Sequence, residues 1–480
     1  MRIESPVSDV APSSAERGRP LGAWELYAFA FGATIGGSWI VLVGSWLHLA
    51  GPLGAIVAFV IGGLEALVVG FSYAELGSLY PKVGGELVFA KRIFGSAAAH
   101  AVGWGLLLLY LALVAFEAVS VCWIVSVIFP GVLGSRLYSI GGADIHWGGA
   151  LLGMVSSIAV AAINYRGAQS AGMLQDALTI GKIVIAAVFI AFGLHAADAG
   201  NFKPLFGPKG GVDAIADFFV LLSSTPLFFA GFGMITQAMG EAKPQECPRL
   251  GRILIAVILT AMAFYLLIIA VVAGLVPATR LAGCELPAVQ AFDVAFGMRA
   301  ITNVVLAVAL LGLMTVWNAT FFAAVRVMEG MGAQGLIGGA WLGRRDARRS
   351  PGGPVLLVFA ASLIGVLIGR TLLLPIISVA GLIVTMLFLF VCWACLVRRT
   401  REPAVPAPYT VPGGAVMIWA GIVLSLLLVG TSLFALFTAS LSGFPPELAV
   451  IIAWGILGYG VWHINGPSRA RSVGLEATRP

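Results

Sequence analysis

The chain has 480 residues, of which 60% are hydrophobic and 10% charged, and its mean hydropathy is +1.00. Soluble domains carry about 25% charged residues, so this composition excludes a soluble globular protein. Apolar stretches long enough to cross a bilayer, roughly 18 residues or more, recur along the chain and predict a polytopic membrane protein. Five cysteines without an extracellular cluster do not form the pattern of a disulfide framework.

The N-terminal segment 1–20 lacks the basic, apolar and small-residue order of a cleaved signal peptide. We expect it to be a disordered cytoplasmic tail. The first apolar segment would then direct the chain to the membrane.

The first apolar segment, 24–48, contains a run of small residues from Gly32 to Ser38 (GATIGGS). Glycine weakens a helix by about 1 kcal/mol relative to alanine, so this run predicts a locally unwound span. Lipid cannot satisfy the freed N–H groups, which suit an anion such as a carboxylate when they open a half-helix. The alternative is a small-residue face that only packs against another helix.

The remaining segments give twelve predicted spans in total. In chain order these are 24–48, 53–80, 98–129, 149–164, 172–194, 214–240, 251–275, 301–329, 354–369, 373–397, 415–438 and 447–464. Between the second and third spans, Glu86 to Gly95 (ELVFAKRIFG) is predicted to be an interfacial helix with Lys91 and Arg92 toward the cytoplasm.

The distribution of basic residues predicts the orientation. With a cytoplasmic N-terminus, 20 of the 28 Lys and Arg residues lie in inner segments and 6 in outer loops, and Lys182 and Arg326 lie within spans. This bias follows the positive-inside rule and predicts that both termini are cytoplasmic. It also accounts for the net charge of +6 and the pI near 9.2 without a nucleic-acid partner. The basic run 344–349 is expected to face anionic membrane lipid.

Several motifs together carry a family resemblance. They are Gly32–Ser38 (GATIGGS), Gly51-Pro52, Tyr73–Glu86 (YAELGSLYPKVGGE), Phe94-Gly95, Asn164–Gly167 (NYRG), Phe229–Gly233 (FAGFG) and Gly240–Pro244 (GEAKP). With them, the chain resembles the amino acid–polyamine–organocation (APC) superfamily of secondary transporters, as an amino acid permease.

The resemblance implies an all-α integral membrane fold with twelve transmembrane helices and a five-plus-five inverted repeat of the LeuT-like kind, in which helices one and six are discontinuous. The repeats would be 24–194 and 214–397, within a transport core at 21–400. Two accessory helices would occupy 401–466, and a cytoplasmic tail 467–480. The sequence supports this independently, because spans one and six hold corresponding places and both contain glycine near mid-span.

Lys182 lies about three turns into the fifth span. A lysine at this depth costs roughly 2.5–3.5 kcal/mol on insertion scales, and burial favours its neutral form. Snorkelling to the cytoplasmic interface is the alternative, over about 15 Å of helix from residue 172. In proton-coupled members of the family a lysine on helix five takes the place of the coupling ion, so the resemblance implies a proton-coupling role for Lys182.

Two glutamates lie near mid-span, Glu65 in the second span and Glu117 in the third. A carboxyl group there must be neutral, paired or beside water. Glu117 is expected to contact a substrate amine or relay a proton, with a protonated structural acid as the alternative. Glu65 is expected to be such a structural acid. Some relatives carry a helix-three glutamate soon after a Gly-Trp pair, but Gly103-Trp104 is followed here by no acid.

The predicted substrate-binding residues lie at the two glycine-rich breaks and on the third span. Phe229 and Phe232 are expected to act as an aromatic lid, as in relatives, or else to pack in the core. Asn318 either completes the site or only joins two helices. The full substrate-binding prediction is Thr34, Ile35, Gly36, Gly37, Ser38, Phe229, Ala230, Gly231, Phe232 and Glu117.

The sequence therefore predicts secondary active transport of an amino acid or small amine across the cell membrane, proton-coupled and by alternating access. An exchanger or a sodium symporter of the same fold, or a nutrient sensor that binds without transport, are the alternatives. The sequence contains no P-loop, nucleophile motif or metal-spaced His/Cys cluster. We therefore expect no enzyme activity, cofactor, metal or nucleic-acid partner, and we expect the substrate, a proton and membrane lipid as partners.

Overall fold

The computed structural model describes residues 21–207, 211–281, 284, 286–338, 341–343, 351–440 and 443–476. Within them, ten helices are long and apolar enough to cross a membrane, which agrees with the all-α membrane class predicted from composition. The N-terminal segment 1–20 and the basic run 344–349 lie outside the described residues.

The elements follow one another as helices, interrupted by one hairpin. They are α1 (Ala23–Thr34), α2 (Ser38–Leu79), α3 (Glu86–Phe94), α4 (Ser96–Ile128), η2 (Pro130–Leu133), β1 (Arg136–Ile140), β2 (Ala143–His146), α5 (Trp147–Tyr165), α6 (Ala168–Ala196), η3 (Ala199–Phe202), α7 (Gly211–Phe229), η4 (Ala230–Met234), α8 (Ile235–Ala238), η5 (Met239–Glu241), η6 (Pro244–Arg249), α9 (Leu250–Leu275), α10 (Ala278–Leu281), α11 (Pro287–Phe296), α12 (Arg299–Ala333), α13 (Gly352–Arg401), α14 (Ala415–Ser440) and α15 (Pro446–Glu476).

Two of the helices are divided internally. Helix α2 has 42 residues and α13 has 50, so that straight helices would be about 63 and 75 Å long, against a hydrocarbon core of about 30 Å. Gly51 in α2 (φ 71°) and Gly369 in α13 (φ 75°) leave helical geometry. Positive φ is accessible to glycine without strain, and Pro52 removes a helical N–H directly after the first of these bends.

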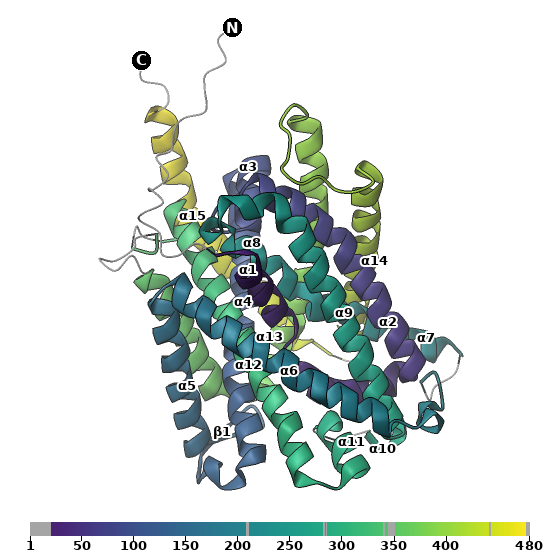
Figure 1. Ribbon diagram of the computed structural model, residues 1–480. Helices are drawn as coiled ribbons and strands as arrows, with labels where there is room; N and C mark the ends of the chain where they lie inside the picture. The colour runs from purple at the N-terminus through teal and green to yellow at the C-terminus, as the bar shows by residue number, and fades with distance from the viewer. Residues whose placement is uncertain are drawn as a thin grey trace.

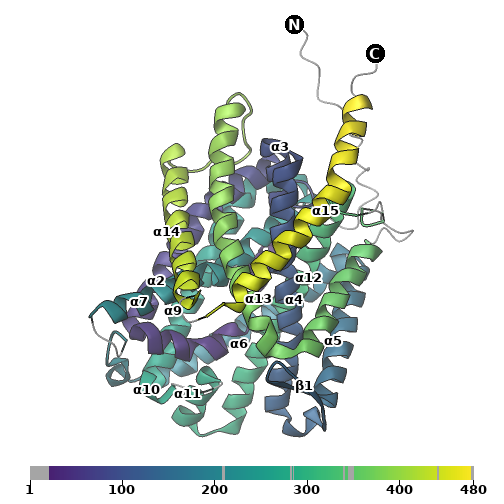
Figure 2. The same ribbon diagram turned by 180° about the vertical axis from the view of Figure 1, so that it is seen from behind.

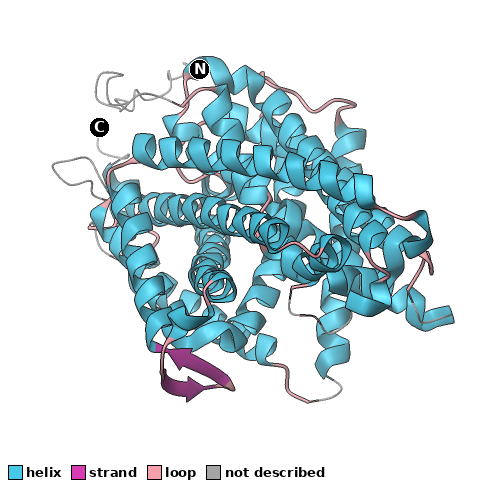
Figure 3. Ribbon diagram, turned by 60° about the horizontal axis from the view of Figure 1, so that its bottom comes forward, coloured by secondary structure: helices cyan, strands magenta, loops and turns pink. Residues whose placement is uncertain are grey.

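The helices form a bundle with different elements at its two ends (Figures 1 and 2). Helix α3, predicted to be cytoplasmic, lies at one end, and β1, α10 and α11, from predicted outer loops, lie at the other. The antiparallel pair β1–β2 supplies the strands of the described chain and lies beside the helices at this second end (Figure 3).

The core is centred on α4, which packs against both α12 and α13. Helix α1 packs against η4, α6, α9 and α12, so that the first break lies inside the bundle. Its side chains from Leu26 to Thr34 are almost all buried. Helix α15 continues to Glu476, beyond the predicted end of the last span and into the predicted C-terminal tail.

Candidate functional site

The first predicted span is broken where the small residues cluster. Helix α1 ends at Thr34 and α2 begins at Ser38, and Ile35 between them is extended (φ −103°, ψ 98°). The Ile35 N–H still donates to the Phe31 carbonyl, at 3.0 Å. The following amides open α2, where the first N–H groups of a helix have no intrahelical acceptor.

The sixth predicted span stays helical but changes its geometry at its glycine cluster, where a 3₁₀ turn interrupts the α-helix; this turn is called the second break below. Helix α7 ends at Phe229, the 3₁₀ turn η4 follows, and α8 resumes at Ile235. The two breaks touch: a Cβ on Gly231 would lie 2.2 Å from the Thr34 nitrogen and 2.3 Å from the Ala33 carbonyl carbon. Only glycine fits this close approach of two backbones.

A cavity of about 710 Å³ opens at the point where the breaks meet. Seven predicted binding residues line it: Thr34, Gly36, Gly37, Ser38, Ala230, Gly231 and Glu117. Most of the remaining wall is apolar, and aromatic side chains contribute to it. The aromatic residues that line it are Trp46, Phe116, Trp123, Phe228 and Tyr265.

Phe229 and Phe232, predicted to act as an aromatic lid, do not line the cavity. Phe229 is fully buried against Phe59 and Tyr265, and Phe232 packs with its ring centroid 5.2 Å from that of Tyr73. The adjacent Phe228 lines the cavity instead. One residue turns a helical side chain by about 100°, an offset that the sequence motif alone does not resolve.

Glu117 on α4 lines the cavity and is 5% exposed. Its Oε2 atom has no hydrogen-bond partner among the described residues. A buried carboxyl oxygen without a partner is costly. This oxygen is therefore suited to a donor that arrives with a ligand.

Lys182 on α6 lies behind the first break and not in the cavity wall. Its Nζ donates to the Ile35 carbonyl at 2.7 Å, to Thr315 Oγ1 at 3.0 Å and to the Gly32 carbonyl at 3.4 Å. Three acceptors match the three donors of an ammonium group. Ile35, another predicted binding residue, thus contacts Lys182 through its carbonyl and is itself buried outside the cavity.

Asn318 joins helices and does not line the cavity. Its Nδ2 donates to Gln175 Oε1 at 2.8 Å and to the Ala171 carbonyl at 3.0 Å, and its Oδ1 accepts from Asn164 at 3.1 Å. Gln175 in turn donates to the Ala28 carbonyl at 3.2 Å. These buried amides tie α12, α5 and α6 to α1.

Glu65 is also outside the cavity. It is fully buried, its Oε1 accepts from Ser425 of α14 at 3.2 Å, and its Oε2 has no partner in the described part of the chain. This placement agrees with the expected structural acid.

Buried polar contacts that were not predicted from the sequence join the helices at the α3 end of the bundle. Glu86, at the start of α3, accepts from Tyr73 at 3.0 Å, Thr236 at 3.3 Å and Gln237 at 2.5 Å. Burial raises the pKa of Glu86 to about 7 in spite of these donors. Arg326 of α12 pairs with Glu241 at 2.8 Å, so α2, α3, α8 and α12 are all held at this end.

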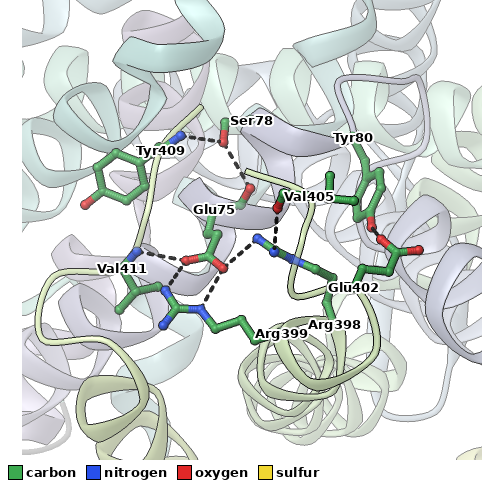
Figure 4. A network of polar contacts seen from close by, with 9 residues as sticks. All are labelled: Glu75, Ser78, Tyr80, Arg398, Arg399, Glu402, Val405, Tyr409 and Val411. Atoms are coloured by element: carbon green, nitrogen blue, oxygen red, sulfur yellow. Dashed lines mark hydrogen bonds and ion pairs between the residues drawn. The ribbon is translucent and has the colours of Figure 1, made fainter. Parts of the chain in front are cut away.

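A second polar network joins α2 to the end of α13 (Figure 4). Glu75 is fully buried and pairs with Arg398, at 2.8 Å, and with Arg399. It also accepts from the Val411 amide at 2.8 Å, while Arg398 donates to the Val405 carbonyl at 3.3 Å. The carboxylate therefore fixes the segment that connects α13 to α14.

Apolar spans that surround a cavity at two touching helix breaks define a multi-pass membrane protein with a candidate small-molecule site. The chain belongs to the amino acid permease family, because residues 21–459 match the family model described as "Amino acid permease". It is thus a transport protein and not an enzyme.

Relatives of known name cover most of the chain. The branched-chain amino acid permease BcaP of Bacillus subtilis (strain 168) is 27% identical over 434 residues, which is 88% of this chain and 90% of the relative. The methylthioribose transporter of the same organism is 26% identical, over 82% of this chain and 84% of the relative. BcaP of Lactococcus lactis subsp. cremoris (strain MG1363) is 28% identical, over 79% of this chain and 82% of the relative.

Proposed function

We propose that this protein carries an amino acid across the cell membrane by proton-coupled alternating access. The observation that supports the proposal most directly is the contact between the two breaks, at Gly231 and Thr34, with a cavity beside it. Broken helices that meet at mid-membrane provide backbone dipoles for a charged solute without exposing them to lipid.

The proposed architecture has twelve crossings in two inverted blocks of five, with both termini cytoplasmic. The bends at Gly51 and Gly369 support two crossings each for α2 and α13. The breaks fall in the first span of each block, 24–194 and 214–397. The bias of Lys and Arg toward the predicted inner segments supports the orientation.

The substrate would be held by complementary groups around the breaks. Its carboxylate would accept from the amides of Gly36, Gly37 and Ser38, at the positive end of the α2 dipole. Its amine would donate to the unpartnered Glu117 oxygen. A large apolar side chain suits the wall near Trp46 and Phe228, and two of the relatives above are named for branched-chain amino acids.

Lys182 would couple transport to the proton. In this proposal its ammonium group holds the Ile35 and Gly32 carbonyls of the first break, and loss of the proton weakens these contacts. The break would then be freer to rearrange as the site turns from outside to inside.

The test is uptake of radiolabelled L-leucine by proteoliposomes with an imposed pH gradient. Accumulation that collapses with a protonophore supports the proposal. Accumulation driven by a sodium gradient alone would indicate a sodium symporter, and uptake only against internal L-leucine would indicate an exchanger. Binding of L-leucine without measurable flux would indicate a sensor.

A further inference from the structure

The cavity extends well beyond the two breaks, toward the predicted outer side. Along α2 its wall runs from Ser38 to Leu49, about 16 Å of helix. At this outer part the wall includes Arg370 of α13 and Glu447 of α15, two side chains of opposite charge and intermediate exposure. Neither residue belongs to the predicted substrate-binding set.

Arg370 contacts the aromatic ring of Trp123. Its guanidinium carbon lies 4.4 Å from the ring centroid of Trp123, which also lines the cavity. This cation–π contact holds the guanidinium group over the ring.

The β1–β2 hairpin supports the bend from which Arg370 projects. A Cβ on the preceding Gly369 would lie 2.9 Å from Ile145 Cδ1, and Tyr138 donates its hydroxyl to the Leu367 carbonyl at 2.5 Å. The bend therefore rests on the hairpin on one side while Arg370 lies on Trp123 on the other. An arginine whose backbone and side chain are both held by packing contacts is typical of a preorganised anion site.

The position of Trp123 separates Arg370 from the breaks. Trp123 follows Glu117 by six residues on α4, which is about 9 Å along the helix. The carboxylate and amine of an α-amino acid are bonded to one carbon atom. An amino acid held between Arg370 and Glu447 would therefore lie further along α4 than one held at Glu117 and the breaks.

We propose that Arg370, Trp123 and Glu447 form an outer subsite that binds the zwitterionic amino acid before it reaches the breaks. The carboxylate pairs with the guanidinium group of Arg370, and the amine pairs with Glu447. The volume of about 710 Å³ lies in the range of about 300–1,000 Å³ that holds ligands much larger than one amino acid, so there is room for both sites. This inference rests on the proposed function of amino acid transport.

The experiment uses the full-length protein in proteoliposomes and measures uptake of external L-leucine. R370Q is expected to raise the KM about tenfold, the loss of about 1.4 kcal/mol of binding, with little change in maximal rate, and R370K to recover part of the loss. R136Q is the matched control, because Arg136 is an exposed arginine on the hairpin, paired with Asp144 at 3.6 Å, and does not line the cavity. Size-exclusion profiles and Tm establish that each variant is folded.

Two analogues of L-leucine separate the roles of the charges. Inhibition by 4-methylpentanoate, which lacks the amine, should weaken in R370Q and not in E447Q. Inhibition by 3-methylbutylamine, which lacks the carboxylate, should weaken in E447Q and not in R370Q. An unchanged KM in folded R370Q, equal effects of both variants on both analogues, or complete loss of L-leucine binding in R370Q would each overturn the outer subsite. Absence of L-leucine uptake by the wild type would instead contradict the proposed function.

Discussion

The backbone of Gly231 lies so close to that of Thr34 that a Cβ at position 231 would be 2.2 Å from the Thr34 nitrogen. The two residues belong to different predicted spans, and their contact is what joins the two breaks beside one cavity. We expect G231A to separate the breaks and to lower the transport rate at least tenfold in folded protein. G455A on α15, where a Cβ would meet nothing within 4 Å, should transport normally. Wild-type rates in G231A would show that the close approach is not needed.

The unpartnered oxygen of Glu117 gives a prediction about affinity. E117Q should weaken L-leucine binding about tenfold or more, because a charge-assisted hydrogen bond to the amine is lost. Binding of 4-methylpentanoate should change little. E65Q is the matched control, since Glu65 is a second buried mid-span glutamate that does not line the cavity. Isothermal titration in detergent measures both, and equal effects of the two substitutions would contradict the assignment.

The raised pKa of Glu86 predicts a dependence of stability on pH. The group titrates near 4.5 when unfolded and near 7 when folded. Between these pH values the folded protein holds a proton that the unfolded chain has lost. This group's contribution to stability therefore falls as pH rises from about 4.5 to about 7, and it stays constant above about pH 7. Tyr73 and Tyr110 are the other titratable groups that interact with it.

Thermal unfolding of E86Q measures this contribution directly. Because glutamine does not titrate, the Tm of the wild type relative to E86Q should fall by several degrees between pH 5 and pH 8. A difference in Tm that stays constant over this range would show that Glu86 does not titrate in it.

The network around Glu75 predicts a large loss of stability. Removing one partner of a buried ion pair costs about 3–5 kcal/mol, so E75Q should lower Tm strongly by freeing Arg398, Arg399 and the segment that they hold. The control is R92Q, which breaks the exposed Arg92–Glu402 pair at 3.1 Å and should cost at most about 1 kcal/mol. Similar Tm values for the two variants would contradict this account of the network.

Much of the fold could be predicted because the hydropathy of a segment decides whether it spans the membrane, and glycine weakens a helix at its own position. The third span was predicted at 98–129 and is Ser96–Ile128. The extended residue Ile35 and the 3₁₀ turn η4 both fall at the predicted glycine clusters. The end of α15 was not predicted, since a helix can continue to Glu476 after its apolar residues stop.

The candidate site was only partly predictable. Gly36, Gly231 and Glu117 line the cavity and were singled out from the sequence because glycine and a mid-span acid are unusual in a membrane helix. Phe228 was missed in favour of Phe229, a difference of one residue in helical phase. Arg370 and Glu447 were missed because a charged residue at the end of a span is ordinary, and only the folded chain brings them to one cavity.

The most direct test of the central claim is L-leucine accumulation driven by a pH gradient in proteoliposomes of K182A, compared with the wild type and with K203A. Lys203 is exposed in a predicted outer loop, so K203A should behave as the wild type. The account predicts that K182A loses gradient-driven accumulation while folded protein still binds L-leucine. Full accumulation by K182A would contradict proton coupling through Lys182.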